Sequence, residues 1–395
     1  MKIQIVNFKP FLKNADAPML TPPEMGAAFA RYSRNNDGLD AILELVKDVP
    51  EDKRVDTIMA FADYGHRSIL DLVEVPIVLE GISMYAAARL FQFSKLAAGQ
   101  ESSTRYIKRG FDLLPYLDTT LSIKQYRESE RLFNAWTENV DAIPQDASRA
   151  TRNKTLDKVR YSLPVVAMTN VAIKMSVRAW QETLRSLSSY PAPFQKPELL
   201  RIVAAIKKEL EKTCGSFAVK HCDWNEAVEL KFAEQARKLR TVAISDTSWE
   251  SIQFNCEELS GWAESDTNIR RKNRYDPYPP CFDETIVSVF MNIRFAELRD
   301  LNRHRNRIVN TWSLNTNETD APTLGTFARS YAKMTLSQLL YEIEIRTSEG
   351  AHPSYRRTMN LVLDQVYRQV RTESHAAGQY LLANLFDNQG QKAEG

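Results

Sequence analysis

A short polar stretch of the chain carries the residue types that bind a phosphate monoester. The segment Gly99-Gln-Glu-Ser-Ser-Thr-Arg-Tyr106 follows an apolar helical run and places three hydroxyl side chains beside Arg105. Hydroxyls, backbone N–H groups and a planar guanidinium together match the acceptor oxygens and the negative charge of a phosphate. A solvated polar loop at a helix end has the same composition, so composition alone leaves both interpretations open.

A second cationic group stands at the end of a predicted helix. The stretch Phe295-Ala-Glu-Leu-Arg-Asp-Leu-Asn-Arg-His-Arg305 closes on three consecutive side chains, Arg303, His304 and Arg305. Consecutive residues at a helix end point in different directions, so these three groups can address a bulky anionic cofactor. The alternative is a solvated basic helix end, which the helix dipole favours without any ligand.

A third candidate is Arg346, which ends the alternating run Tyr341-Glu-Ile-Glu-Ile-Arg346. A loop with His352 and then a helix follow. A guanidinium at the end of an element can donate to a carbonyl of a planar heterocycle. The alternative is an ion pair between Arg346 and a neighbouring carboxylate, with Glu342 and Glu344 as the candidates.

The elements that must position these groups are mostly helices. Residues 2–8 (KIQIVNF) alternate as a strand does, and Glu74–Leu79 (EVPIVL) predicts a second strand whose proline favours an edge position. Helices are predicted to start at Thr21-Pro-Pro-Glu and at Ser83, to span 198–213, and to run from about Tyr355 into the 380s. The polar stretch 262–280 is predicted to be a loop. The chain is therefore predicted to be α+β and dominated by helices.

Length and composition narrow the possible functions. The 395 residues suit two domains of roughly 200 residues each. A net charge of +2 gives no reason to expect a nucleic-acid polymer as partner, and the sequence holds neither glycine fingerprint of a dinucleotide or P-loop site. The four cysteines lack paired C-x-x-C spacing, so we expect no metal site. We also expect no signal peptide and no membrane span, and hence a cytoplasmic protein.

The first half of the chain resembles the flavin-dependent thymidylate synthases. Gly65-His66-Arg67-Ser68-Ile69-Leu70-Asp71 is similar to the family motif G-H-x-S/T-x-x-E/D, and QESSTRY is similar to the end of R-H-R-x-x-S-x-N/Q-x-x-S-x-R-Y. With the register fixed by Arg105-Tyr106, the basic triplet of the family falls on Phe93-Ser94-Lys95. Arg160 and Arg178 match the later arginine motifs, and the uracil-facing arginine falls near Leu187. This copy keeps the anion-binding loop and lacks the triplet.

The second half resembles another copy of the same family with the opposite losses. Arg303-His304-Arg305 matches the triplet, and Asn315-Thr316 stands where the arginine and tyrosine of the loop would be. Arg346 takes the uracil-facing place. His352 lies near the flavin-contacting histidine of the family, two residues out of register. Asp300 replaces a substrate-contacting glutamine.

The resemblance implies two tandem flavin-dependent thymidylate synthase-like domains, residues 1–224 and 225–395, each helix-rich with a small antiparallel sheet. It also implies one hybrid site per chain, because the two copies retain complementary motifs. Arg303 and Arg346 are expected to be catalytic. The expected substrate-binding residues are Gln100, Glu101, Ser102, Ser103, Arg105, Arg160 and Asp300. The expected cofactor-binding residues are His66, Ser68, Arg178, Arg303, His304, Arg305, Asn310 and His352.

The activity implied by the resemblance is reductive methylation at C5 of a uracil ring. The family uses FAD, with NADPH and methylenetetrahydrofolate as co-substrates, and dUMP is the default acceptor. We further expect a homodimer whose four domains form a pseudo-tetramer. The alternatives are a non-catalytic nucleotide-binding homologue, a related transferase acting on a modified pyrimidine nucleotide, and a structural descendant without a ligand.

Overall fold

The structure is a computed structural model of the 395-residue chain. It describes residues 1–6, 20–32, 38–47, 49–50, 53, 67–94, 97–104, 123–191, 196–241, 251–256, 269–273, 275–304, 306–316, 321–347 and 352–385.

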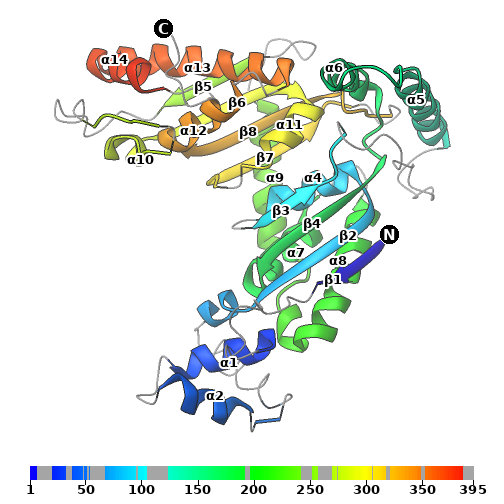
Figure 1. The fold of residues 1–395 in the computed structure, drawn as a ribbon, viewed down its shortest axis with the longest axis vertical. Coiled ribbons are helices and arrows are strands. Elements are labelled where there is room, and N and C mark those ends of the chain that lie inside the picture. The colour runs from blue at the N-terminus through cyan, green and yellow to red at the C-terminus, as the bar shows by residue number, and fades with distance from the viewer. Residues whose placement is uncertain are drawn as a thin grey trace. The chain divides into compact units, whose positions relative to one another are not determined.

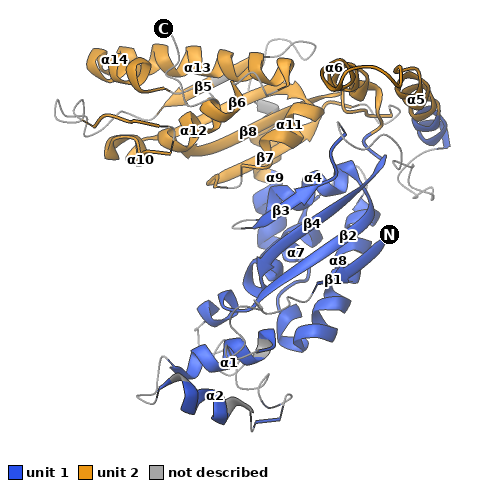
Figure 2. Ribbon diagram, viewed as in Figure 1, with its two compact units in different colours: residues 1–130, 165–233 blue, residues 131–164, 234–395 orange. Residues whose placement is uncertain are grey.

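Two compact units make up the chain (Figure 2). The first consists of residues 1–130 and 165–233, and the second consists of residues 131–164 and 234–395. Residues 131–164 stand in the sequence between two strands of the first unit, yet they pack with the second. The predicted domain boundary at 224/225 stays a prediction.

The first unit contains a four-stranded sheet with its helices (Figure 1). Its elements are β1 Lys2–Ile5, α1 Pro22–Tyr32, α2 Leu39–Lys47, η1 Arg67–Asp71, β2 Glu74–Ser83, α4 Met84–Phe93, β3 Ala98–Glu101, β4 Met168–Ser176, α7 Val177–Ser189, α8 Lys196–Cys214 and η3 Ser216–Val219. Two longer helices run across the division between units, α5 Ile123–Asp141 and α9 Glu226–Thr241.

The second unit contains the other four-stranded sheet, again with helices (Figure 1). Its elements are α6 Arg149–Val159, η2 Arg160–Ser162, β5 Ser251–Cys256, α10 Pro280–Glu284, β6 Ile286–Arg294, α11 Phe295–Leu301, β7 Val309–Leu314, β8 Phe327–Thr335, α12 Leu336–Arg346, α13 Pro353–Glu373 and α14 His375–Asn384.

The two sheets have the same strand order. The first runs β1-β2-β4-β3 and the second β5-β6-β8-β7, with every neighbouring pair antiparallel. In both sheets the two inner strands, β2 and β4 or β6 and β8, lead directly into a helix. The first residues of these helices also bond alike: Met84 and Tyr85 donate to the carbonyls of residues 167 and 165, and Phe295 and Ala296 to those of residues 326 and 324. The α+β class and the small antiparallel sheets are confirmed.

Each sheet buries alternate residues of its inner strands under helices. In β2, Val75, Ile77 and Leu79 are buried, and β6 buries Val287 and Val289 in the same way. Helices α4 and α7 pack on the first sheet, and α11, α12 and α13 pack on the second. This is the alternation expected of a sheet with one covered face.

Several predicted elements are confirmed. The helix predicted at Thr21 is α1, and it begins with a capping box: the Thr21 backbone N–H donates to Glu24 and the Glu24 N–H donates to the Thr21 hydroxyl. Ser83 caps α4 by accepting from the Ala86 N–H at 2.9 Å. The helix predicted over 198–213 is α8, and the strand at the N-terminus is β1.

One detail of the sequence-based prediction is wrong at a strand and one at a helix. Pro76 does not mark an edge, because β2 pairs with β1 on one side and β4 on the other; Pro76 lies where the β1 pairing ends. The alternating run 341–346 forms part of helix α12, in which Glu342 and Glu344 are buried by ion pairs. The long C-terminal helix is two helices that meet at Ser374, whose side chain caps α14.

Within the described residues, none of the helices is both long enough and apolar enough to span a lipid bilayer.

Candidate functional site

Arg346 ends α12 with its guanidinium directed at His304. Its Nε–H donates to His304 Nε2 at 3.0 Å, and its Nη2 lies 3.5 Å from the Asp300 carbonyl oxygen. A ring nitrogen that accepts a hydrogen bond carries no proton, so this contact requires a neutral imidazole. Burial and the positive charge of Arg346 lower the pKa of His304 to about 4, against the opposing pull of Glu342. His304 is therefore a neutral acceptor that orients Arg346.

Neither nearby carboxylate of α12 pairs with Arg346. Glu342 binds Arg307 through two hydrogen bonds of 2.7 and 3.3 Å, and Glu344 binds Arg271 through two of 2.6 and 3.1 Å. All four side chains are almost fully buried. The ion pair considered above as the alternative is thus absent among the described residues. Arg346 Nη2 contacts the Asp300 carbonyl oxygen, and Arg346 Nη1 remains for another acceptor.

Arg160 is positioned by backbone hydrogen bonds between its turn, η2, and the loop before β8. The Gly325 N–H donates to the Tyr161 carbonyl and the Leu324 N–H to the Leu163 carbonyl, both at 2.8 Å. A Cβ on Gly325 would lie 2.8 Å from the Tyr161 oxygen, closer than side chains tolerate. Glycine at position 325 is therefore what admits this close approach.

Arg160, Asp300 and Arg303 form the anionic and cationic centre of the site. Arg160 Nη1 lies 3.7 Å from Asp300 Oδ2, and Arg303 Nη2 lies 3.6 Å from Asp300 Oδ1. Burial raises the pKa of Asp300, but Arg160, Arg303 and Arg346 together hold it below its usual value. The carboxylate is ionised at neutral pH. Together with His304 and Arg346, these residues are called the arginine cluster below.

A buried network flanks the arginine cluster. The Tyr161 hydroxyl donates to Glu297 Oε1 at 2.6 Å and lies 2.9 Å from the Ser354 hydroxyl. The His352 Nδ1 accepts the Ser354 backbone N–H and caps α13, while its Nε2 lies 3.3 Å from the Asp157 carbonyl oxygen. Burial first, and then the charge of Glu297, raises the pKa of Tyr161. The network joins η2 to the starts of α11 and α13.

Several buried polar atoms of this region make no hydrogen bond within the described residues. They are Arg160 Nε and Nη2, Arg307 Nη1 and the Tyr355 hydroxyl. The Tyr355 ring lies against Arg346, 5.4 Å from the guanidinium carbon to the ring centroid. Buried N–H donors without acceptors cost free energy, about 1–3 kcal/mol each. An anion with several acceptor oxygens would satisfy the arginine donors.

The loop predicted to bind phosphate lies in the first unit. Gln100 and Glu101 end β3, which pairs with β4, and the Ser102 N–H donates to the Asn170 carbonyl at 2.9 Å. Ser103 follows, half-buried. Strand pairing therefore fixes the base of the loop.

Two of the predicted cofactor-binding residues also lie in the first unit and are linked. Ser68 sits in η1, and Arg178, in the first turn of α7, forms an ion pair with Asp71 at the end of η1. The N–O distance is 3.1 Å.

His66, Arg105 and Arg305 lie outside the described residues. Asn310 in β7 donates to the Asn302 side chain at the end of α11, at 3.0 Å.

The corresponding region of the first unit is built from different side chains. Phe93, at the start of the triplet position, packs on Tyr190 and Phe232 with ring centroids 5.5 and 5.0 Å away. Leu187, near the place of the uracil-facing arginine, is 1% exposed. The Arg89 guanidinium carbon lies 4.3 Å from the centroid of the Tyr190 ring, and Lys95 lies outside the described residues.

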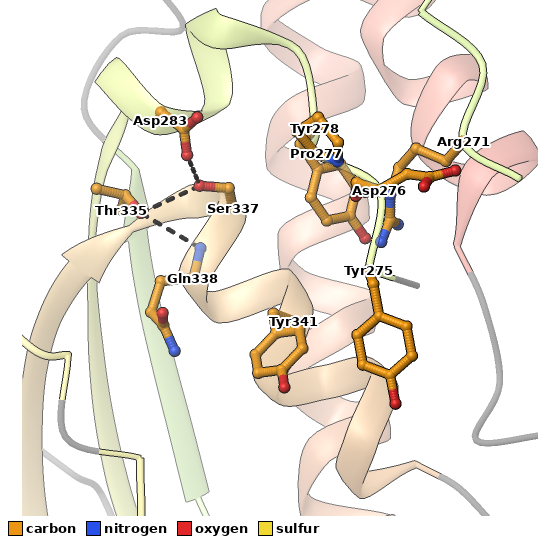
Figure 3. Close-up of a pocket in the computed structure, with 10 residues that line it drawn as sticks. All are labelled: Arg271, Tyr275, Asp276, Pro277, Tyr278, Asp283, Thr335, Ser337, Gln338 and Tyr341. Atoms are coloured by element: carbon orange, nitrogen blue, oxygen red, sulfur yellow. Dashed lines mark hydrogen bonds between the residues drawn. The ribbon is translucent and has the colours of Figure 1, made fainter. Parts of the chain in front are cut away.

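A separate pocket of about 300 Å³ opens on the second unit (Figure 3). Tyr275 and Tyr341 stand on one side of it, and Asp283, Ser337 and Gln338 on the other. Ser337 donates to Asp283, and the Gln338 backbone N–H donates to Thr335. No member of the arginine cluster lines this pocket. Tyr278, which also lines it, donates to Glu344 and stacks on Arg271, and is thus part of a structural ion-pair cluster.

Three residues of the site, Tyr161, Glu297 and Tyr355, are not among the site residues predicted from the sequence. Tyr161 stands next to Arg160 in the motif that resembles the family, and Glu297 lies one helical turn before Asp300. A glutamate three residues before an aspartate shares its helix face, and this spacing could have identified Glu297. Tyr355 gave no such pattern.

Comparison with known proteins agrees with the motifs. Residues 19–214 match the family model described as thymidylate synthase complementing protein, which confirms the resemblance of the first half of the chain. A protein of Chlamydia muridarum described as a UPF0159 protein is 26% identical over 223 residues, which are 45% of this chain and 42% of that protein. The match thus spans less than half the length of the relative.

Two solved structures are similar at low identity. Thymidylate synthase X from Helicobacter pylori, determined with FAD and dUMP, has 14% identity and a TM-score of 0.33 over 56% of this chain and all of that one. The UMP/dUMP methylase PolB from Streptomyces cacaoi, bound with 5-Br dUMP, has 15% identity and a TM-score of 0.37 over 55% of this chain and 93% of that one.

Proposed function

Over residues 19–214 this chain belongs to the thymidylate synthase complementing protein family, and from that membership we propose that it methylates a uracil nucleotide at C5. The acceptor to test first is dUMP, the default of the family. FAD is the proposed cofactor, with NADPH and methylenetetrahydrofolate as co-substrates.

One observation carries the proposal: the Nη1 group of Arg346 has no hydrogen-bond partner among the described residues. Both carboxylates of its own helix are bound by Arg307 and Arg271, neutral His304 accepts from its Nε, and its Nη2 contacts the Asp300 carbonyl oxygen at 3.5 Å. A guanidinium with oriented Nη groups is suited to a carbonyl of a planar ring. It stabilises the negative charge that spreads onto that oxygen when C5 acts as a nucleophile.

Arg160 supplies the phosphate contact in this proposal. Two of its guanidinium nitrogens are buried without hydrogen-bond partners among the described residues, and a phosphate offers the missing acceptors. Docking of η2 on Gly325 holds the arginine in place before the nucleotide arrives. Such preorganisation lowers the cost of binding and keeps the ring in one orientation.

Arg303 and His304 are proposed to hold the flavin on the exposed end of α11. The Arg303 side chain is 46% exposed and its ion pair with Asp300 is long, so its donors can reach an anionic cofactor. When bound, FAD supplies hydride transfer that no side chain can perform. Both ring nitrogens of His352 contact the protein, and we propose that it positions α13.

The first copy would complete the site with its loop, Gln100 to Arg105. We propose that the chain arose by tandem duplication, which the shared strand order and the shared bonding of the helix starts support. Complementary losses then leave one working site per chain. Two chains would pair to restore four copies of the fold.

The deciding experiment is a visible absorbance spectrum of the purified protein with a count of bound flavin. We expect one FAD per chain, bleaching with NADPH, and methyl transfer to dUMP or a related uracil nucleotide in the presence of methylenetetrahydrofolate. Two FAD per chain would contradict the single hybrid site. Nucleotide binding without any flavin would instead support a non-catalytic homologue.

A further inference from the structure

The carboxylate of Asp300 makes ion pairs but accepts no hydrogen bond among the described residues. Its two oxygens lie 3.7 Å from Arg160 and 3.6 Å from Arg303, within ion-pair range but beyond hydrogen-bond range. No hydrogen bond to this carboxylate occurs within the described part of the chain. The side chain is 19% exposed, so a ligand can reach it. An ionised carboxylate accepts up to about four hydrogen bonds and donates none.

The neighbours of Asp300 indicate which part of a nucleotide would lie beside it. Arg160, the proposed phosphate contact, is on one side of the carboxylate, and Arg346, the proposed base contact, approaches the backbone carbonyl of the same residue. In a nucleoside monophosphate the sugar stands between the phosphate and the base. A nucleotide bound by both arginines therefore carries its sugar past Asp300.

A carboxylate and an amide differ in the hydrogen bonds that they can make with a sugar. The amide that the family has at this place offers one acceptor oxygen and a donor. Asp300 offers two acceptor oxygens and no donor, a pattern that matches two neighbouring hydroxyl groups. Ribose has such a pair, at C2′ and C3′, whereas deoxyribose has only the 3′ hydroxyl. Acidic side chains recognise ribose hydroxyls in the same way in dinucleotide sites.

Resting on the proposed function, we infer that Asp300 is a specificity-determining residue that selects a uracil ribonucleotide, UMP, over dUMP. The positive charges of the arginines offset the repulsion between the Asp300 carboxylate and the nucleotide phosphate. They also keep the carboxylate ionised, so both of its oxygens remain hydrogen-bond acceptors. A site built to bind a hydroxyl discriminates against the analogue that lacks it, because its polar group then stays unsatisfied.

Equilibrium binding of UMP and dUMP to the full chain tests this inference. We expect UMP to bind at least about tenfold more tightly than dUMP, the effect of one hydrogen bond to a charged group. Asp300→Asn, which keeps the shape and removes one acceptor, should bring the two affinities to within about threefold. Asp364→Asn, an exposed position on α13 paired with Arg368, is the matched control and should keep the preference.

The outcomes separate this inference from the proposed function. If the wild-type protein binds dUMP as tightly as UMP, or more tightly, Asp300 does not select the sugar, and the proposed methylation of a uracil nucleotide stands. If neither nucleotide binds, the proposed function itself fails. The comparison on wild-type protein decides the question even if Asp300→Asn folds poorly, and UMP lacking the 3′ hydroxyl should bind at least several-fold more weakly than UMP itself.

Discussion

Arg346 and His304 are joined by a hydrogen bond of 3.0 Å in which the arginine is the donor and a neutral imidazole the acceptor. The two glutamates nearest to Arg346 on its own helix are bound instead by Arg307 and Arg271. Because Arg346 forms no ion pair with these glutamates, we expect its replacement to affect activity more than stability.

Replacing Arg346 should therefore impair activity more than folding. Arg346→Lys keeps the charge and loses the planar donor fork, and we expect turnover to fall about 100-fold or more, as when one donor to a developing charge is removed. Steady-state assays and a thermal melt check this together. Arg368→Lys, exposed on α13, should leave both unchanged. A melt that collapses along with activity would assign Arg346 a structural role.

Gly325→Ala should weaken nucleotide binding without touching any ligand-binding side chain. The added methyl would lie 2.8 Å from the Tyr161 carbonyl, so η2 has to move and take Arg160 with it. A displacement of this kind is expected to weaken affinity at least about tenfold. Gly38→Ala is the control, since a methyl group added there would meet no atom within 4 Å. Equal affinities in the two variants would show that η2 tolerates the shift.

Tyr161→Phe should destabilise the protein by about 1–3 kcal/mol, because the buried Glu297 loses its hydroxyl donor. Chemical denaturation measures the change. Tyr32→Phe alters a tyrosine that is 54% exposed and should stay within about 0.5 kcal/mol of wild type. A neutral result for Tyr161→Phe would mean that Ser354 or water replaces the lost donor.

The buried ion pair of Arg271 with Glu344 should be far more sensitive than a surface pair. Glu344→Ala leaves a buried guanidinium without its carboxylate, and we expect a loss of about 3–5 kcal/mol. The exposed pair of Asp364 with Arg368 is the comparison, and Asp364→Ala should cost less than about 1 kcal/mol. Denaturant midpoints of the two variants give both values. Similar losses would contradict the burial of Arg271.

Stability should fall on acidification through the titration of His304. Its pKa is about 4 in the folded protein and near 6.5 when unfolded. Between these values the unfolded chain binds more protons, so the free energy of unfolding rises from pH 4 to 6.5 and is then level for this group. His304→Gln should flatten that part of the profile of melting temperature against pH. An unchanged slope would show that His304 titrates normally.

The sequence indicated the residues of the arginine cluster better than it indicated the path of the chain. Arg160, Asp300, Arg303, His304 and Arg346 were all selected from motifs, and the structure places these five in one cluster of the second unit. Local patterns could not predict that Arg160 packs with the second unit, because its position in the sequence is between two strands of the first sheet. Its placement depends on the pairing of η2 with residues 323–325. This contact joins segments far apart in the sequence, so no hydrophobic periodicity indicates it.

Local patterns also mislead where distant residues intervene. Residues 341–346 alternate in the sequence but form a helix, and both glutamates are buried by arginines from distant segments. Pro76 was assigned to an edge because proline lacks an N–H, yet it sits where the first strand has already ended its pairing. In each case a tertiary partner outweighed a local preference.

Residues 131–164 belong to the second unit although they lie between two segments of the first, and this limits where the chain can be divided. A cut at residue 224 would leave Arg160 and Tyr161 on a fragment without Glu297, Asp300 and Gly325, and the complementary fragment would have to fold around an absent turn. The two compact units therefore do not correspond to two continuous stretches of sequence. Separating them as whole units would require three cuts, after residues 130, 164 and 233, and two reconnections.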